Sequence, residues 1–111
     1  MAPRLLDATR CLSYLTIEHK GAIPDDVAPL MDGWGFGCDI CNEVCPWNER
    51  FATPSTVAEF APRGDAEGRS AAFFERMSEK EFAERYAGTA LERTGVEGMR
   101  RNARAVEAGR A

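Results

Sequence analysis

The sequence predicts a mostly α-helical chain with irregular loops, and three observations lead to this fold class. Apolar residues recur at helical spacing in several short stretches, whereas no stretch alternates polar and apolar residues as a half-buried strand does. Ten glycines and six prolines separate these stretches. The 111 residues are 44% hydrophobic and 29% charged, which is typical of a globular rather than a disordered protein.

The first helix is expected over residues 6–15. Asp7 is its predicted N-cap, because an Asp side chain can accept hydrogen bonds from the free amides of a helix start. Leu12 and Leu15 would share the apolar face of this helix. Gly21 then supplies a turn.

A second helix is predicted from Pro24 to about Met31, because proline suits the first turn of a helix. A tight loop over residues 32–37 follows, in which glycines alternate with aromatic side chains, and we expect it to pack against the cysteines after it. One or two helical turns are predicted over residues 38–44. Pro46 is expected to end them.

Residues 48–69 are broken by prolines and glycines and are predicted to hold at most a short helix over 55–60. Two helices are expected after this connector, over 70–77 and 78–86. Ser78-x-x-Glu81 is a capping box, in which reciprocal hydrogen bonds fix a helix start. Gly88 should end the second of these helices.

The last helix is predicted over residues 96–108, with an apolar stripe of Met99, Ala103 and Val106. Several arginines lie in or near it: Arg93, Arg100, Arg101, Arg104 and Arg110. A helix of this kind either faces solvent or contacts phosphates, although the net charge of −4 argues against binding to nucleic acid in bulk.

Four cysteines carry the clearest chemical signal, and three of them form Cys38-x2-Cys41-x3-Cys45-Pro46. This spacing is the end of the bacterial iron-sulfur run, whose last cysteine ligates a different cluster from the others. A zinc site, one cluster that uses all four cysteines, and halves of two clusters are the three possible metal sites. Cys11 stands far from the rest, which fits the paired cysteines of zinc sites poorly. Buried free thiols are the alternative without chemistry.

The remaining candidate residues predict no catalytic centre in this chain. His19 is the single histidine and is interpreted as an exposed turn residue. Trp34 and Trp47 flank the cysteines, where they would either exclude water from a cluster or belong to the core. The sequence has no phosphate-binding glycine loop, no Ser-His-Asp set and no paired carboxylates, so no catalytic residue is assigned.

The sequence also predicts where the protein works. It has no signal peptide and no apolar run long enough to span a membrane, so we expect a cytoplasmic protein without a membrane partner. In that reducing compartment, closely spaced cysteines favour metal ligation over a disulfide framework.

Two blocks of sequence resemble the epoxyqueuosine reductase family. Residues 6–21 read LDATRCLSYLTIEHKG, and residues 36–48 read FGCDICNEVCPWN. The resemblance implies a cobalamin-dependent oxidoreductase with two 4Fe-4S clusters that reduces epoxyqueuosine to queuosine in tRNA. It also implies electron transfer from an unidentified donor, through the clusters, to cobalamin.

The resemblance assigns roles to particular residues. Cys11, Cys38 and Cys41 would ligate the cluster nearer the cobalamin, and Cys45 would ligate the other. A C-x2-C-x2-C-x3-C-P run upstream would supply the remaining ligands. We further expect Ser13 and Asp39 to approach the corrin ring. Lys20 would lie in a turn that faces tRNA.

The resemblance also implies a domain division and an incomplete enzyme. Residues 1–50 would form the C-terminal half of a ferredoxin-like double-cluster domain, 51–69 a connector and 70–111 a C-terminal helical segment. We expect the chain to be a C-terminal fragment, inactive without the N-terminal cobalamin-binding half, from a mis-called start or a split gene. A stand-alone ferredoxin-like electron carrier or a structural zinc module is the alternative.

Overall fold

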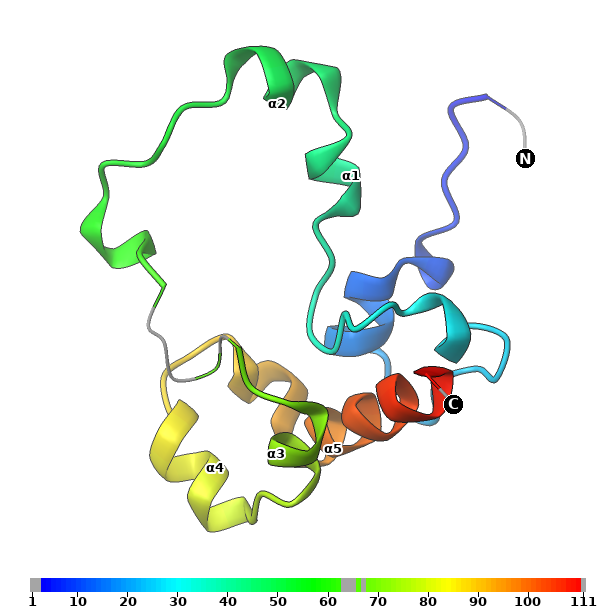
Figure 1. The fold of residues 1–111 in the computed structure, drawn as a ribbon, viewed down its shortest axis with the longest axis vertical. Helices are drawn as coiled ribbons and strands as arrows, with labels where there is room; N and C mark the ends of the chain where they lie inside the picture. The colour runs from blue at the N-terminus through cyan, green and yellow to red at the C-terminus, as the bar shows by residue number, and fades with distance from the viewer. Residues whose placement is uncertain (1–2, 63–65, 67, 111) are drawn as a thin grey trace.

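The computed structural model describes residues 3–62, 66 and 68–110, and in this part of the chain every regular element is helical (Figure 1). The prediction of a mostly α-helical chain is therefore confirmed. None of the described helices is both long and apolar enough to cross a membrane. In chain order the elements are η1 Ala8–Arg10, η2 Tyr14–Glu18, η3 Ala28–Leu30, α1 Ile40–Glu43, α2 Pro46–Phe51, η4 Ala58–Phe60, α3 Ala71–Glu75, α4 Glu79–Tyr86 and α5 Leu91–Arg110.

Helix α5 organises the body of the molecule, which we define as residues 8–37 and 68–110. Figure 1 shows α3 and α4 beside one part of α5, and the turns of the N-terminal third beside the other. Two core clusters follow this division. One consists of Met77, Phe82, Tyr86, Leu91, Val96 and Met99, and the other of Leu15, Ile23, Val27, Met31 and Val106. Because α5 contributes to both clusters, it joins the two halves of the body.

The apolar stripe predicted for the last helix is confirmed, since Met99, Ala103 and Val106 are all buried. As a whole α5 runs from Leu91 to Arg110, but its long regular part follows Gly95, where the helix was predicted to begin. Gly95, with φ of 77° and ψ of 168°, kinks it between a first turn and the long remainder. Only glycine adopts this backbone conformation easily, so the kink is built into the sequence.

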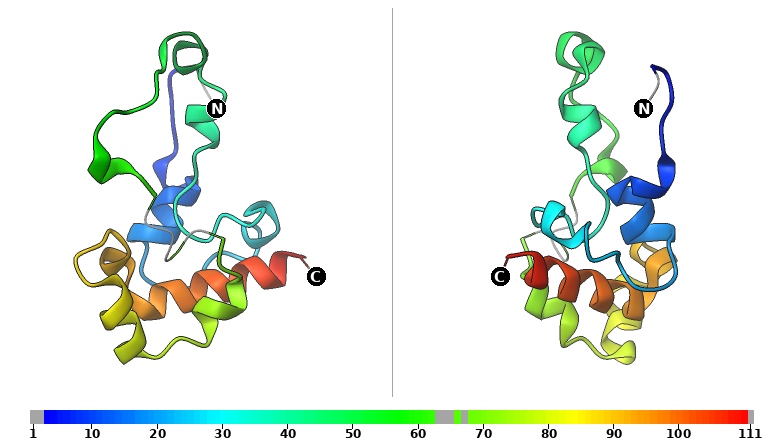
Figure 2. Two further views of the ribbon diagram at one scale, coloured as in Figure 1. Left: turned by 60° about the vertical axis from the view of Figure 1, so that its left-hand side comes forward. Right: turned by 90° about the vertical axis from the view of Figure 1, so that its right-hand side faces the viewer.

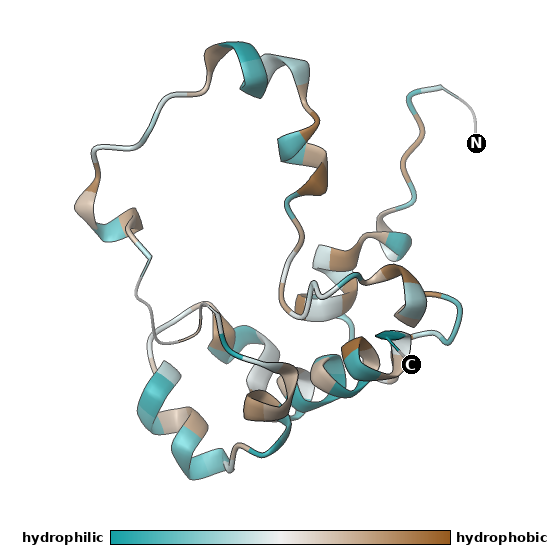
Figure 3. Ribbon diagram, viewed as in Figure 1, coloured by the Kyte–Doolittle hydropathy of each residue, from teal (hydrophilic) through white to brown (hydrophobic). Residues whose placement is uncertain are grey.

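Residues 38–62 leave the body and return to it, and we call this segment the arm. Figures 1 and 2 show it as an open loop that carries α1, α2 and η4 away from the other helices. Every residue from 39 to 60 is exposed except Cys45, which is half-buried. Figure 3 nevertheless shows several hydrophobic stretches, drawn in brown, along the arm. Its large exposed apolar residues are Ile40, Val44, Trp47, Phe51, Val57 and Phe60.

The first predicted helix forms as two shorter elements. Asp7 is the N-cap, as predicted, and its carboxylate accepts a hydrogen bond from the Thr9 amide at 3.0 Å. The helix is interrupted after η1, and η2 is a π-helix in which the His19 amide donates to the Tyr14 carbonyl. The prediction of one continuous helix over residues 6–15 was therefore wrong.

Two prolines explain where the helices of this region differ from the prediction. The helix expected from Pro24 to Met31 is reduced to the 3-10 turn η3, since Pro29 lacks the amide that an α-helix would need there. Pro46 was predicted to end the helical turns before it, and α1 does end at Glu43, but Pro46 also begins a helix that was not predicted. It occupies the first turn of α2, where the missing amide costs nothing.

Two N-caps in the body agree with the sequence. Ser78 Oγ accepts a hydrogen bond from the Glu81 amide at 3.1 Å, as the capping box predicts, although Glu81 Oε1 accepts from Arg85. Ser70 caps α3 in the same way. Gly88 follows α4 with a φ of 76°, which fits its predicted role as a terminator. The short helix expected over residues 55–60 shrinks to η4.

Candidate metal centre

All four cysteines are free thiols that solvent can reach. Cys11 and Cys41 are exposed, whereas Cys38 and Cys45 are half-buried. Cys11 lies between η1 and η2, Cys38 at the base of the arm, Cys41 within α1, and Cys45 at the junction of α1 and α2. The alternative of four buried thiols is therefore contradicted.

Two side chains of η2 and its N-cap fasten the Cys11 segment to the Cys38 segment. Ser13 Oγ donates a hydrogen bond to the Cys38 carbonyl at 3.3 Å. Thr16, which is fully buried, accepts a hydrogen bond on Oγ1 from the Gly37 amide at 2.9 Å and donates to the Leu12 carbonyl. The cysteines at positions 11 and 38 thus belong to one connected unit, although 26 residues separate them.

The buried side-chain amide of Asn102, on helix α5, binds both of these segments. Asn102 is completely buried, and its Nδ2 donates to the Thr16 carbonyl at 2.7 Å and to the Gly35 carbonyl at 2.9 Å. One side chain therefore positions both cysteine segments at once. A buried amide is retained only when its partners are satisfied, and Asn102 meets this condition.

Arg101 complements Asn102 by binding the turn after η2. Its guanidinium donates to the carbonyls of Leu15, His19 and Gly21 and to Asn102 Oδ1. Burial lowers the pKa of Arg101, because partial removal from water disfavours its charged form.

The arginines of the last helix were predicted either to face solvent or to contact phosphates, and in the structure several of them bind groups within the chain. Arg100 donates to the Met77 carbonyl and to Glu97, and Arg101 uses its N–H groups on neutral oxygens within the chain. Arg93 pairs with Glu18 at 2.5 Å, and Arg104 approaches Glu75 at 3.5 Å. Arg100 and Arg101 therefore bind main-chain carbonyls of other segments to α5.

Local hydrogen bonds favour the thiolate form of Cys11. The Tyr14 amide, helped by the amide and hydroxyl of Ser13, lowers the pKa of the Cys11 thiol, and the small degree of burial opposes this only in part. The thiolate is the form of cysteine that ligates metals. The turn into η2 thus favours the form of Cys11 that a metal site would require.

Cys45 has a different setting. The Glu49 amide donates to its carbonyl at 3.0 Å as α2 begins, and Asn48 Nδ2 donates to the Asn42 carbonyl at 3.1 Å across the junction of the two arm helices. Trp47 is 73% exposed and stacks on Phe51, with ring centroids 5.8 Å apart. The interpretation of Trp47 as a core residue was therefore wrong, whereas Trp34 is half-buried.

The donor set fits an iron-sulfur group in its chemistry. Thiolates are the ligands of 4Fe-4S clusters, and this chain presents four, none of which is in a disulfide. Within residues 3–62, 66 and 68–110, no three Cys, His, Asp or Glu side chains are close enough together to hold a metal ion. The described residues therefore do not by themselves form a closed four-thiolate site.

The structure also locates the other residues that the sequence singled out. Ser13 is half-buried and uses its hydroxyl on the Cys38 carbonyl, whereas Asp39 is exposed at the start of α1 without a side-chain capping bond. His19 is half-buried, and its Nε2 lies 3.1 Å from the Ala22 carbonyl. A role of Ser13 and Asp39 beside a cofactor stays a prediction.

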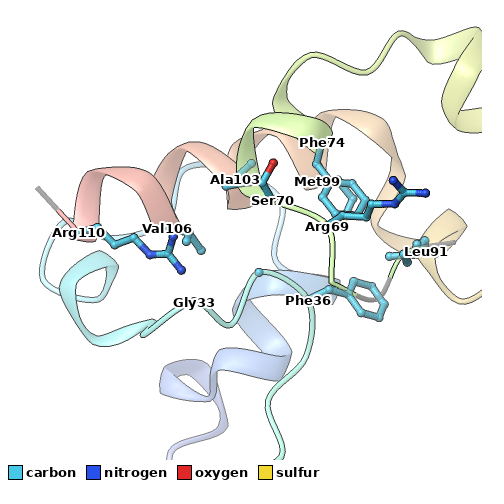
Figure 4. A pocket seen from close by; sticks show the side chains of 13 residues that line it. Gly33, Phe36, Arg69, Ser70, Phe74, Leu91, Met99, Ala103, Val106 and Arg110 are labelled. Atoms are coloured by element: carbon cyan, nitrogen blue, oxygen red, sulfur yellow. The ribbon is translucent and has the colours of Figure 1, made fainter. Parts of the chain in front are cut away.

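A separate cavity of about 440 Å³ lies away from the cysteines, between α3, α5 and the loop that contains Gly33. Figure 4 shows Arg110 and Val106 at one end and Arg69, Met99, Phe36 and Leu91 toward the other. No cysteine is among its lining residues. The loop over residues 32–37 thus contributes Gly33, Gly35 and Phe36 to this cavity beside α5.

Comparison with known proteins gives consistent results. Residues 2–48 match the model of a family described as a 4Fe-4S double cluster binding domain. The chain is 49% identical over 98 residues to an epoxyqueuosine reductase of Cyclobacterium marinum, a match that covers 88% of this chain and 30% of the relative. The corresponding enzyme of Pseudomonas aeruginosa is 48% identical over 102 residues, with 92% of this chain and 28% of the relative covered.

A solved structure shares the fold. The structure of epoxyqueuosine reductase from Streptococcus thermophilus matches with a TM-score of 0.73 and 27% sequence identity, over 92% of this chain and 26% of that one. The chain spans about 30% of the length of the relatives it matches.

Proposed function

Since the chain is a homologue of epoxyqueuosine reductase over part of that enzyme's length, we propose that it supplies iron-sulfur ligands to such a reductase. The complete enzyme would act on tRNA in the cytoplasm and reduce epoxyqueuosine to queuosine. One observation carries the proposal. Ser13, Thr16 and Asn102 hold the Cys11 and Cys38 segments together as a prepared ligand unit, within the residues that match the double-cluster family.

The four thiolates divide between two clusters in this proposal. Cys11, Cys38 and Cys41 would hold one cluster, and Cys45 would hold the other. The division is supported by the start of a new helix at Cys45, which separates it from the preceding turn. Two clusters with four cysteines each need eight thiolates, and this sequence contains four. The other four would come from a part of the reductase outside these residues.

Cobalamin is the second cofactor of the proposed enzyme, and its chemistry is reduction of the epoxide by electrons that the clusters supply. Ser13 and Asp39 would lie beside it. Asp39 is exposed and free of a capping bond, so its carboxylate is available to a neighbouring group. Ser13 would act chiefly by fixing the Cys38 main chain. The residues of this chain alone would be inactive, because the cobalamin-binding part lies outside them.

The test uses the complete reductase, purified and reconstituted with iron and sulfide without oxygen. Each cysteine is changed to Ser in turn, and iron content and the electron paramagnetic resonance of the reduced clusters are measured. We expect Cys11→Ser, Cys38→Ser and Cys41→Ser to weaken one cluster signal. Cys45→Ser should weaken the other. Queuosine formed in tRNA is measured in parallel.

Other outcomes would contradict the proposal in different ways. If all four variants lose the same signal, the chain holds one cluster and the electron-carrier alternative is correct. A colourless protein with one zinc ion would instead make this a structural site. Ser55→Ala, in the same arm, is the control and should leave both signals intact, because it removes a hydroxyl and no thiolate.

A further inference from the structure

A second cavity, of about 370 Å³, lies where the turn after η2 meets the polar side of α5. We call it the basic notch and define it by Lys20, Gly21, Glu97, Gly98, Arg101 and Arg104, which line it. No cysteine lines it, and neither do Ser13, Thr16 and Asn102, which hold the proposed ligand unit together. Its walls come from positions almost 80 residues apart, and Arg101 fastens them together through the Gly21 carbonyl.

The notch carries positive charge that the chain does not neutralise. Arg101 binds only neutral oxygens, so no carboxylate within the described residues compensates its charge. Lys20 is exposed, and its Nζ donates to the Arg93 carbonyl at 3.4 Å, which is also a neutral partner. The one acidic lining residue, Glu97, is paired with Arg100 outside the notch. The cavity therefore has a surplus of positive charge.

The two kinds of cation have different capacities to bind a ligand. Arg101 has committed its N–H groups to the chain, so it contributes a fixed charge rather than new hydrogen bonds. Lys20 has three ammonium protons and a single long contact, so it keeps donors for an anion. Arg104 is 61% exposed and 3.5 Å from Glu75, and it can also turn toward the notch.

A glycine keeps the main chain accessible on one wall of the notch. Gly21 has a φ of +116°, a conformation that other residues rarely adopt, so a residue without a side chain is favoured there. Gly98, on the other wall, allows close packing, because a Cβ atom there would come within 2.4 Å of Thr94 Cγ2.

We propose that the basic notch binds a backbone phosphate of the tRNA, with Lys20 as the direct ligand and Arg101 as the fixed charge behind it. This proposal rests on the proposed function, because that function makes tRNA the anionic partner. A phosphodiester suits the notch because lysine binds phosphate as a point charge and needs no planar, paired geometry. A strand of RNA would then continue over the exposed arginines of α5, Arg93 and Arg104.

The experiment measures binding of an unmodified tRNA transcript to the complete reductase at several salt concentrations. Each phosphate contact contributes about 0.7 to 0.9 to the slope of log K against log salt. We therefore expect Lys20→Ala to lower the slope by about that amount and to weaken binding several-fold at low salt. Lys20→Arg should restore the slope, because it returns the charge.

Lys80 offers a matched control, since it is the sequence's other lysine. It lies on α4, is 87% exposed, and sits 4.0 Å from Glu84. Lys80→Ala should leave both the affinity and the slope unchanged. An equal fall in the salt slope for Lys20→Ala and Lys80→Ala would mean that any surface charge has this effect. That result would overturn the proposal that the basic notch binds phosphate.

Failure of this inference differs from failure of the proposed function. If the reductase binds tRNA and forms queuosine while Lys20→Ala keeps the full salt slope, the notch proposal is wrong and the function stands. If the unaltered reductase with both clusters does not bind tRNA at all, the proposed function is overturned together with the notch. Circular dichroism of each variant verifies that its fold is intact.

Discussion

The body and the arm of this molecule are built in opposite ways from similar residues. In the body, apolar side chains meet in two clusters that share α5, and buried polar groups such as Thr16 and Asn102 are hydrogen-bonded. In the arm, side chains of the same kinds stand in solvent, and no residue from 39 to 60 is buried. Figure 3 shows both the packed helices and the open loop.

The comparison indicates that the body is stabilised by its own packing, whereas the arm has no packing of its own. Apolar surface that stays in water contributes no burial energy, and exposed apolar patches of this kind mark interaction sites. The arm carries two of the three adjacent cysteines beyond its base, Cys41 and Cys45. Under the proposed function, the rest of the reductase and the clusters would cover it.

Removal of a core side chain should affect the body far more than the arm. Met31 is completely buried, so Met31→Ala should lower the free energy of unfolding of the 111-residue chain by about 2–5 kcal/mol. Trp47 is larger but exposed, and Trp47→Ala should change stability by less than about 0.5 kcal/mol. Urea unfolding followed by circular dichroism measures both. A comparable loss for Trp47→Ala would show that the arm packs in solution.

Asn102 in the body and Asn48 in the arm allow the same comparison for polar side chains. Asn102→Ala removes the donor to the Gly35 carbonyl and should cost about 1–3 kcal/mol for the group left without its partner. Asn48→Ala removes a hydrogen bond of 3.1 Å in the exposed arm, where water replaces it, so the cost should be within about 0.5 kcal/mol. The same unfolding measurement applies. Equal costs would contradict the role of Asn102 as the anchor of both cysteine segments.

Helix caps extend the test to surface positions. Ser78→Ala should destabilise the chain by about 0.5–2 kcal/mol, because Ser78 Oγ accepts from the Glu81 amide. Asp39 stands at the same position of α1 without a side-chain capping bond, so Asp39→Ala should have no measurable effect on stability. If Asp39→Ala destabilises the chain as much as Ser78→Ala does, α1 is capped in solution.

The smallest effect concerns the acid titration of Asp7. Hydrogen bonds from the hydroxyl and the amide of Thr9 lower the pKa of Asp7, because they favour its carboxylate. The contribution of this cap is therefore complete above the unfolded pKa of about 3.9 and is lost as the pH falls through the lowered value. The Thr9 amide chemical shift, followed by nuclear magnetic resonance, should have its inflection below pH 3.9.

Asp7→Asn removes the titrating group, so this variant should show no such inflection at Thr9. An inflection in the wild-type chain above the unfolded pKa would contradict the lowered value. The effect on overall stability should be slight, because the side chain is exposed.

Local signals in the sequence predicted local features well. The Asp7 and Ser78 caps, the helical turn at the cysteines and the stripe of α5 all follow from neighbours within a few residues. The cysteine spacing likewise predicted the match of residues 2–48 to a double-cluster family. Such features need no knowledge of distant segments.

The missed features depend on distant contacts or on proline positions. Asn102 and Thr16 look like ordinary polar residues until Asn102 Nδ2 meets the Thr16 carbonyl 86 positions away. Arg101 resembled a surface arginine for the same reason. The helix α2 was missed because Pro46 was interpreted as a terminator, although proline also suits a helix start.

The long sequence separation between Asn102 and the segments that it binds has a consequence for biosynthesis. A ribosome that makes this sequence releases the four cysteines before the residues of α5. The Thr16 and Gly35 carbonyls can therefore reach their common donor only after α5 has emerged. Metal loading that requires the anchored segments would follow the emergence of α5 rather than that of the cysteines.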